Sequence, residues 1–127
     1  MVGMGRFLLV CLGGAIGSGA RYLFSTAMSR AFGNFPFGTL GVNVIGSFLI
    51  SLVMALALGK AGAIGVDARL FIVTGVLGGF TTYSSFNYET LHLAQSGAVG
   101  LAVLNAALTL VCCLGAGIAG LLVGRLG

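Results

Sequence analysis

The fold is decided by the stretch Gly78-Gly79-Phe80-Thr81-Thr82-Tyr83-Ser84-Ser85-Phe86-Asn87, which is polar but carries no charge. It lies inside a run from 70 to 88 that contains no Asp, Glu, Lys or Arg, and about 20 such residues cross a bilayer as a helix. Within this run, glycines and hydroxyl side chains occupy positions where lipid-facing helices prefer Leu and Ile. The sequence therefore predicts a membrane span that is interrupted near its middle.

Backbone groups that leave helical geometry inside a membrane need partners, because each unpaired N–H or C=O costs several kcal/mol. An interruption here must therefore be buried in protein or line a hydrated path, and it would free carbonyls for a cation and N–H groups for an anion. The alternative is a continuous helix in which the Ser and Thr hydroxyls bond to carbonyls one turn earlier.

The rest of the chain is equally apolar: 58% of its 127 residues are hydrophobic and 6% are charged. A soluble domain carries about a quarter of its residues as charged side chains, so we expect an all-α, multi-pass membrane protein. We predict one transmembrane domain over 1–127 with four helices, the third broken, at about 6–29, 39–59, 69–93 and 98–124. An even number of spans places both termini on one side.

The six basic residues are scattered rather than clustered, so nucleic acid is not an expected partner. Arg6, Lys60, Arg69 and Arg125 fall on the side of the termini, and only Arg21 and Arg30 fall on the other side. Because this excess is small, the positive-inside rule orients the chain weakly. Two copies inserted in opposite senses would supply the inverted symmetry that many transport proteins build within one chain.

The sequence offers no sign of enzymatic chemistry or of a metal cluster. Cys11, Cys112 and Cys113 lie in apolar runs without the spacing of a disulfide framework or a metal site. We find no nucleophile with a base, no phosphate-binding loop and no ligand cluster. A cleaved signal peptide is not expected either, because apolar segments recur along the chain and the cleavage-site pattern is poor.

Some polar and aromatic residues are candidates for an ion path. Tyr83 and Phe86 are three residues apart and share a helix face, and their positive ring edges favour an anion, although plain packing explains the same spacing. Asn43 shares a face with Thr39 and offers two amide donors, either to an anion or to a neighbouring helix.

Two charged residues are further candidates. Glu89 continues the face of Tyr83 and Phe86, with Ser85 one turn before it, as a proton carrier or an anchor for hydroxyls. Arg21, near the far end of the first span, either attracts anions by its field or extends to the membrane interface.

Three segments together resemble the Fluc fluoride channels, also called CrcB proteins. They are Gly-Gly-Ala-Ile-Gly-Ser-Gly-Ala-Arg-Tyr (13–22), Gly-Thr-Leu-Gly-Val-Asn-Val-Ile-Gly (38–46) and Thr-Gly-Val-Leu-Gly-Gly-Phe-Thr-Thr-Tyr-Ser-Ser-Phe (74–86). Their order and spacing agree with that family over essentially the whole chain. The resemblance implies an antiparallel, dual-topology homodimer in the lipid bilayer with two fluoride pores and a central structural sodium ion.

The resemblance also implies roles for individual residues. Main-chain carbonyls of Gly78 and Thr81 would hold the sodium ion, and Asn43 would donate to fluoride. The aromatic pair of the pore would be Tyr83 and Phe86, and Arg21 would stand at the pore mouth. The polar track would comprise Thr39, Ser84, Ser85 and Glu89. On the fourth span, the corresponding residues are Asn105 and Thr109. The chain departs from the family pattern at Tyr83, where Phe is usual, and at Asn105, where some members have Tyr.

We therefore expect a passive, fluoride-selective channel in a bacterial inner (plasma) membrane that exports fluoride from the cytoplasm and relieves fluoride toxicity. The main alternative is a small proton-coupled drug or cation exporter of the four-helix dual-topology type. Such exporters carry an essential Glu in the first helix and a Trp in the pocket, and this chain has neither. A third possibility is a membrane scaffold protein, in which the residues from Thr81 to Ser85 would be replaceable.

Overall fold

The computed structural model describes residues 2–59 and 62–127, and every regular element in these ranges is a helix. The helices α1 (Met4–Phe32), α2 (Phe37–Leu58) and α6 (Val99–Leu126) are each long and apolar enough to cross a membrane. The expected all-helical class is therefore confirmed for the described part of the chain. Lys60, which we counted among the basic residues on the terminal side, lies outside the described residues.

A further pass along the bundle is made by four consecutive segments in place of one long helix. They are α3 (Val66–Arg69), the π-helical segment η1 (Leu70–Leu77), α4 (Gly78–Phe80) and α5 (Tyr83–Gln95). Two residues between α4 and α5 are not helical. We call α3, η1, α4 and α5 together the broken span.

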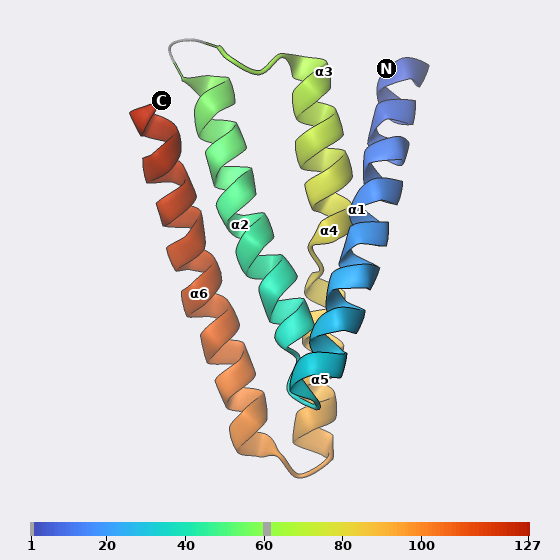
Figure 1. Ribbon diagram of the computed structural model, residues 1–127, viewed down its shortest axis with the longest axis vertical. Helices are drawn as coiled ribbons and strands as arrows, with labels where there is room; N and C mark the ends of the chain where they lie inside the picture. The colour runs from blue at the N-terminus through green and yellow to red at the C-terminus, as the bar shows by residue number, and fades with distance from the viewer. Residues whose placement is uncertain (1, 60–61) are drawn as a thin grey trace.

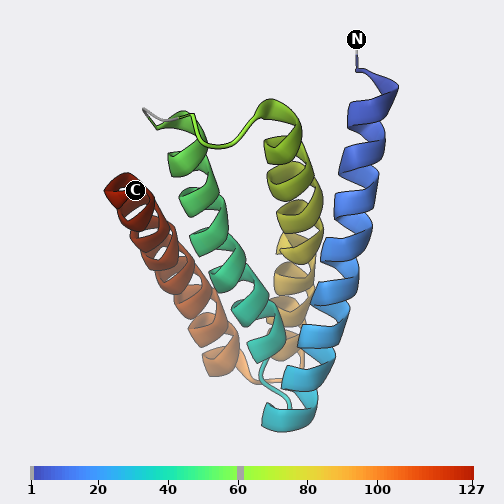
Figure 2. The same ribbon diagram turned by 45° about the horizontal axis from the view of Figure 1, so that its top comes forward.

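The helices run side by side, and both termini lie at the end of the bundle that also carries the connection from α2 to α3 (Figure 1). The other two connections, from α1 to α2 and from α5 to α6, lie at the opposite end. In both views α6 runs along α2, whereas α1 runs along η1 (Figure 2). The broken span thus lies between α1 on one side and the pair of α2 and α6 on the other.

Close packing within these pairs depends on glycine. A Cβ atom added at Gly17 of α1 would collide with the carbonyl oxygen of Val76 in η1, and one added at Gly120 of α6 would collide with that of Phe48 in α2. Glycine at such positions lets two helix backbones approach closely, and the resulting van der Waals packing helps helices to associate in lipid. Gly17 therefore allows α1 to pack against the broken span, and Gly120 allows α6 to pack against α2.

The exterior of the bundle is apolar. At most 11% of the hydrophobic window in each of α1, α2 and α6 is buried, and large side chains such as Leu12, Ile16, Leu110 and Val111 are more than half exposed. Large contiguous apolar surfaces are rare on soluble monomers. This surface therefore requires lipid or another protein chain against it.

Candidate functional site

The interruption of the broken span is confined to two residues. Thr81 (φ −86°, ψ 157°) and Thr82 (φ −154°, ψ 117°) are extended, whereas Leu77 and Gly78 before them are helical. The N–H and hydroxyl of Thr81 both donate to the carbonyl of Leu77, at 3.0 and 2.9 Å, and so end the first half of the span. The continuous-helix alternative is therefore wrong.

The second half begins with a side-chain cap. The hydroxyl oxygen of Thr82 accepts a hydrogen bond from the backbone N–H of Ser85 at 3.2 Å. This bond satisfies one of the N–H groups that have no partner within the first turn of a helix. Thr82 therefore both ends the extended segment and starts α5.

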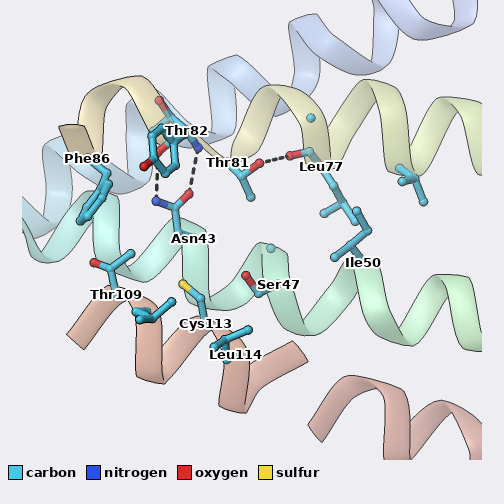
Figure 3. A pocket seen from close by; sticks show the side chains of 15 residues that line it. Asn43, Ser47, Ile50, Leu77, Thr81, Thr82, Phe86, Thr109, Cys113 and Leu114 are labelled. Atoms are coloured by element: carbon cyan, nitrogen blue, oxygen red, sulfur yellow. Dashed lines mark hydrogen bonds between the residues drawn. The ribbon is translucent and has the colours of Figure 1, made fainter. Parts of the chain in front are cut away.

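The backbone groups of Thr82 are satisfied by one side chain of α2. The Nδ2 group of Asn43 donates to the Thr82 carbonyl at 3.0 Å, and the Thr82 N–H donates to Oδ1 of Asn43 at 2.9 Å (Figure 3). From the opposite direction, Nε of Arg21 in α1 donates to the carbonyl of Gly79 at 2.9 Å. Two neighbouring helices thus supply the hydrogen bonds that the interruption removes.

Two carbonyl groups at the break remain without such a bond. Among the described residues, no donor reaches the carbonyl oxygen of Gly78 or that of Thr81. Gly78 is exposed on the surface of the single chain, and Gly78 and Thr81 both line a pocket between α2, the broken span and α6. A main-chain carbonyl is a hard oxygen ligand, so this pair is chemically suited to the sodium ion that the family resemblance implies.

The largest pocket described here, of about 450 Å³, lies between α2, the broken span and α6 (Figure 3). We call it the aromatic pocket, because Tyr83 and Phe86 line it with ring centroids 5.6 Å apart at an interplanar angle of 61°. Asn43 and Thr109 line it as well, and the hydroxyl of Thr109 is buried without a hydrogen-bond partner among the described residues. Several predicted pore residues thus meet in one place.

A second pocket, of about 290 Å³, lies on the α1 side of the break, and we call it the arginine pocket. Its lining is mostly polar and comprises Ser18, Arg21, Tyr22, Ser25, Thr26, Thr39, Thr82, Ser85 and Glu89. The buried hydroxyl of Thr39 donates to Oε1 of Glu89 at 2.8 Å, whereas Oε2 is buried without a partner in the described part of the chain. Thr82 lines both pockets and so separates them.

Two of the predicted site residues lie outside these pockets. Ser84 is exposed, and its hydroxyl lies 3.4 Å from that of Thr82. Asn105 is 1% exposed and donates from Nδ2 to the hydroxyl of Thr90 at 2.8 Å, which joins α6 to α5. Of the two residues singled out on the fourth span, the structure therefore brings Thr109 to the aromatic pocket and places Asn105 between helices.

Sequence reasoning also missed lining residues that helical spacing would have found. Ser47 lies one turn after Asn43 on α2 and lines the aromatic pocket with Cys113 of α6. On α1, Ser18 and Ser25 lie three residues before and four residues after Arg21, and both line the arginine pocket. Residues at these spacings share a helix face.

An interrupted span, with main-chain carbonyls that lack helical partners and a pocket on each side, is typical of membrane transport proteins. The comparison with known sequences agrees with this class. Residues 8–121 match the family described as CrcB-like protein, Camphor Resistance (CrcB), and the chain belongs to this family.

Curated relatives carry the name fluoride-specific ion channel FluC. The protein from Anaeromyxobacter sp. (strain K) is 55% identical over 123 residues, which cover 96% of this chain and 97% of that protein. The Agrobacterium fabrum protein is 49% identical, with 92% and 94% covered. A protein from Thermus thermophilus is 54% identical over 104 residues, with 81% and 82% covered.

Proposed function

We propose that this chain is a passive, fluoride-selective ion channel, a multi-pass bacterial membrane protein that exports fluoride from the cytoplasm. The observation that carries this proposal is the convergence of Asn43, Tyr83 and Phe86 on one pocket at the interrupted helix. Relatives that are half identical over nearly the whole chain are named as fluoride-specific channels. The exporter alternative is not favoured by any of these relatives.

The lining of the aromatic pocket suits a small anion that must shed part of its water. One N–H of the Asn43 amide is bonded to Thr82, and the second has no acceptor among the described residues, which leaves it to an ion. Ring edges of Tyr83 and Phe86 present partial positive charge. Neutral donors of this kind replace hydration without trapping the ion, as a buried Lys or Arg would.

The polar lining of the arginine pocket provides a second set of contacts, in which Thr39, Ser85 and Glu89 form a track on the α1 side of the break. The hydroxyl of Ser85 is a neutral donor in this track. The single hydroxyl proton of Thr39 is already donated to Oε1 of Glu89 at 2.8 Å, so Thr39 holds that carboxylate in place. Arg21 lies at the same pocket. The anion would then be passed between donors on the two sides of Thr82.

The functional unit in this proposal is an antiparallel, dual-topology homodimer with a structural sodium ion at its centre. The carbonyls of Gly78 and Thr81 have no donor among the described residues, and a second copy facing the first would bring four such oxygens together. The exposed apolar surface beside the aromatic pocket is consistent with that contact. Sodium would fix two broken spans in register and neutralise their carbonyl dipoles.

The test is ion efflux from liposomes that contain the purified protein, recorded with a fluoride electrode and, in parallel, a chloride electrode. We expect rapid fluoride efflux once a potassium ionophore dissipates the charge, and little chloride efflux. Liposomes without protein provide the control. Absence of fluoride flux, or a chloride flux nearly as fast as that of fluoride, would contradict the channel proposal.

The same assay separates a channel from a scaffold protein. Thr81 and Thr82 shape the break, so replacing the residues from Thr81 to Ser85 with Ala should abolish fluoride flux. A scaffold role predicts that the replaced chain keeps its function in cells and that the native chain shows no flux.

A further inference from the structure

Arg21 makes a contact that the sequence alone does not reveal. It is partly buried, and its Nε group donates to the carbonyl of Gly79, a residue 58 positions away in the chain. Gly79 lies in the last turn before the break. The guanidinium therefore joins α1 to the end of the first half of the broken span.

A cation at this position suits the electrostatics of the break. The last carbonyls of a helix carry partial negative charge, and a cation near them is stabilising. Glu89 lines the same pocket as Arg21, yet the described residues contain no ion pair between them. The bonded nitrogen of Arg21 is used on a neutral main-chain carbonyl, although a carboxylate lies in the same pocket.

Arg21 and Asn43 together determine which carbonyls of the break stay free. Arg21 occupies the carbonyl of Gly79 and Asn43 occupies that of Thr82. The carbonyl of Gly78, just before Gly79, and that of Thr81, just before Thr82, have no donor among the described residues. The two side chains, from helices on opposite sides, leave the pair of carbonyls that fits a cation.

We propose that Arg21 is a positioning residue that fixes the interrupted backbone through its hydrogen bond to Gly79, and that this bond, not the field of its charge on a passing anion, is its main contribution. This inference deepens the proposed channel function. Its first test, however, measures the backbone of the purified protein and does not depend on conduction.

Two substitutions separate the hydrogen bond from the charge. Arg21→Gln places an amide nitrogen at the same number of bonds from Cα as Nε, so it keeps a donor but loses the charge. Arg21→Met has an unbranched side chain of similar reach with neither donor nor charge. Arg30→Gln, at an exposed position near the end of α1, removes a charge away from the break and is the matched control.

Hydrogen–deuterium exchange of the peptide covering 77–86 is the first measurement. Loss of a hydrogen bond from a charged donor raises the equilibrium constant for local opening about tenfold or more. Arg21→Met should therefore exchange about tenfold faster in this peptide, with exchange in α6 unchanged. Arg21→Gln and Arg30→Gln should remain close to the native rate. If Arg21→Gln exchanges as fast as Arg21→Met, or Arg21→Met stays at the native rate, the proposal is wrong.

Fluoride efflux at low and high salt is the second measurement. A positioning role predicts that Arg21→Gln conducts several-fold faster than Arg21→Met at every salt concentration. A field effect predicts equal losses in both variants that shrink in about 1 M salt, where the screening length is about 3 Å. Should Arg21→Met fail to fold, the flux of Arg21→Gln relative to the native protein still tests the proposal. Near-native flux at every salt concentration supports the hydrogen bond, and a loss that shrinks in about 1 M salt contradicts it.

Discussion

At the scale of single residues, Thr82 shows how an interruption is stabilised inside a membrane. Its N–H and carbonyl are bonded to Asn43, and its hydroxyl accepts from the N–H of Ser85. Because no water is available to replace a missing bond in the bilayer, each of these groups needs a protein partner. Asn43 is thus both a candidate ion ligand and a support of the break.

Asn43→Asp is the sharpest test of that residue. A carboxylate near a passing anion costs about 4 kcal/mol at 4 Å and an effective dielectric constant of about 20, so we expect fluoride flux to fall by on the order of a hundredfold or more. In the native protein the Thr82 carbonyl accepts a hydrogen bond from the amide N–H of Asn43, and the variant replaces this donor with a carboxylate oxygen. Fluoride efflux from liposomes measures the effect.

The matched control for this charge is Gln95→Glu, because Gln95 is exposed at the last position of α5 and lines neither the aromatic nor the arginine pocket. We expect its flux to stay close to the native value. Unchanged flux in Asn43→Asp would remove Asn43 from the ion path.

At the scale of helices, small residues decide which elements pack together. The backbones of α1 and η1 are in contact at Gly13 and Gly75, because a Cβ atom added to either glycine would lie 2.9 Å from the Cα of the other. Gly120 and Gly124 allow the same close packing of α6 against α2. These contacts position the two walls between which the broken span lies.

Gly120→Ala should destabilise the bundle by about 1–3 kcal/mol, because the added methyl group meets the Phe48 carbonyl and the helices must separate. Gly115→Ala, on the same helix, is the control, since nothing lies within 4 Å of its added Cβ. That change should be neutral or stabilising by up to about 1 kcal/mol, as Ala favours helices over Gly. Thermal unfolding in detergent compares them, and equal stability of both variants would contradict the close contact.

At the scale of the whole molecule, the described surface combines carbonyls without a donor at the break with a large apolar area. Gly78 and Thr81, whose carbonyls have no donor among the described residues, line the aromatic pocket, and large apolar side chains cover the outside of α1 and α6. Lipid satisfies apolar side chains but not carbonyl groups. This combination favours a second copy of the chain across the break, with lipid around the remaining surface.

An antiparallel pair requires that the chain insert in both orientations, and labelling can test this in cells. In a chain whose three cysteines are replaced by Ala, Ser96→Cys and Ala63→Cys place single thiols in the α5–α6 and α2–α3 connections, which lie at opposite ends of the bundle (Figure 1). Because the charge bias is weak, a membrane-impermeant maleimide should label about half of the chains at each position. Complete labelling at one position and none at the other would contradict dual topology.

The sequence by itself determined the helical class and the presence of an interruption, because hydropathy and residue type act locally. Glycines and hydroxyls from Gly78 to Ser85 cannot form a good lipid-facing helix wherever they lie, and uncharged apolar runs predict helices without knowledge of their neighbours. The extended pair at Thr81 and Thr82 is a narrower interruption than the whole polar stretch suggests.

Only the tertiary structure decided how the freed groups are used. Arg21 reaches Gly79 and Asn43 reaches Thr82 across 58 and 39 positions, and such partners depend on how helices rotate against each other. The same rotation directs Thr109 into the aromatic pocket but Asn105 toward Thr90. Helical spacing predicts which residues share a face, whereas packing across several helices sets what that face meets.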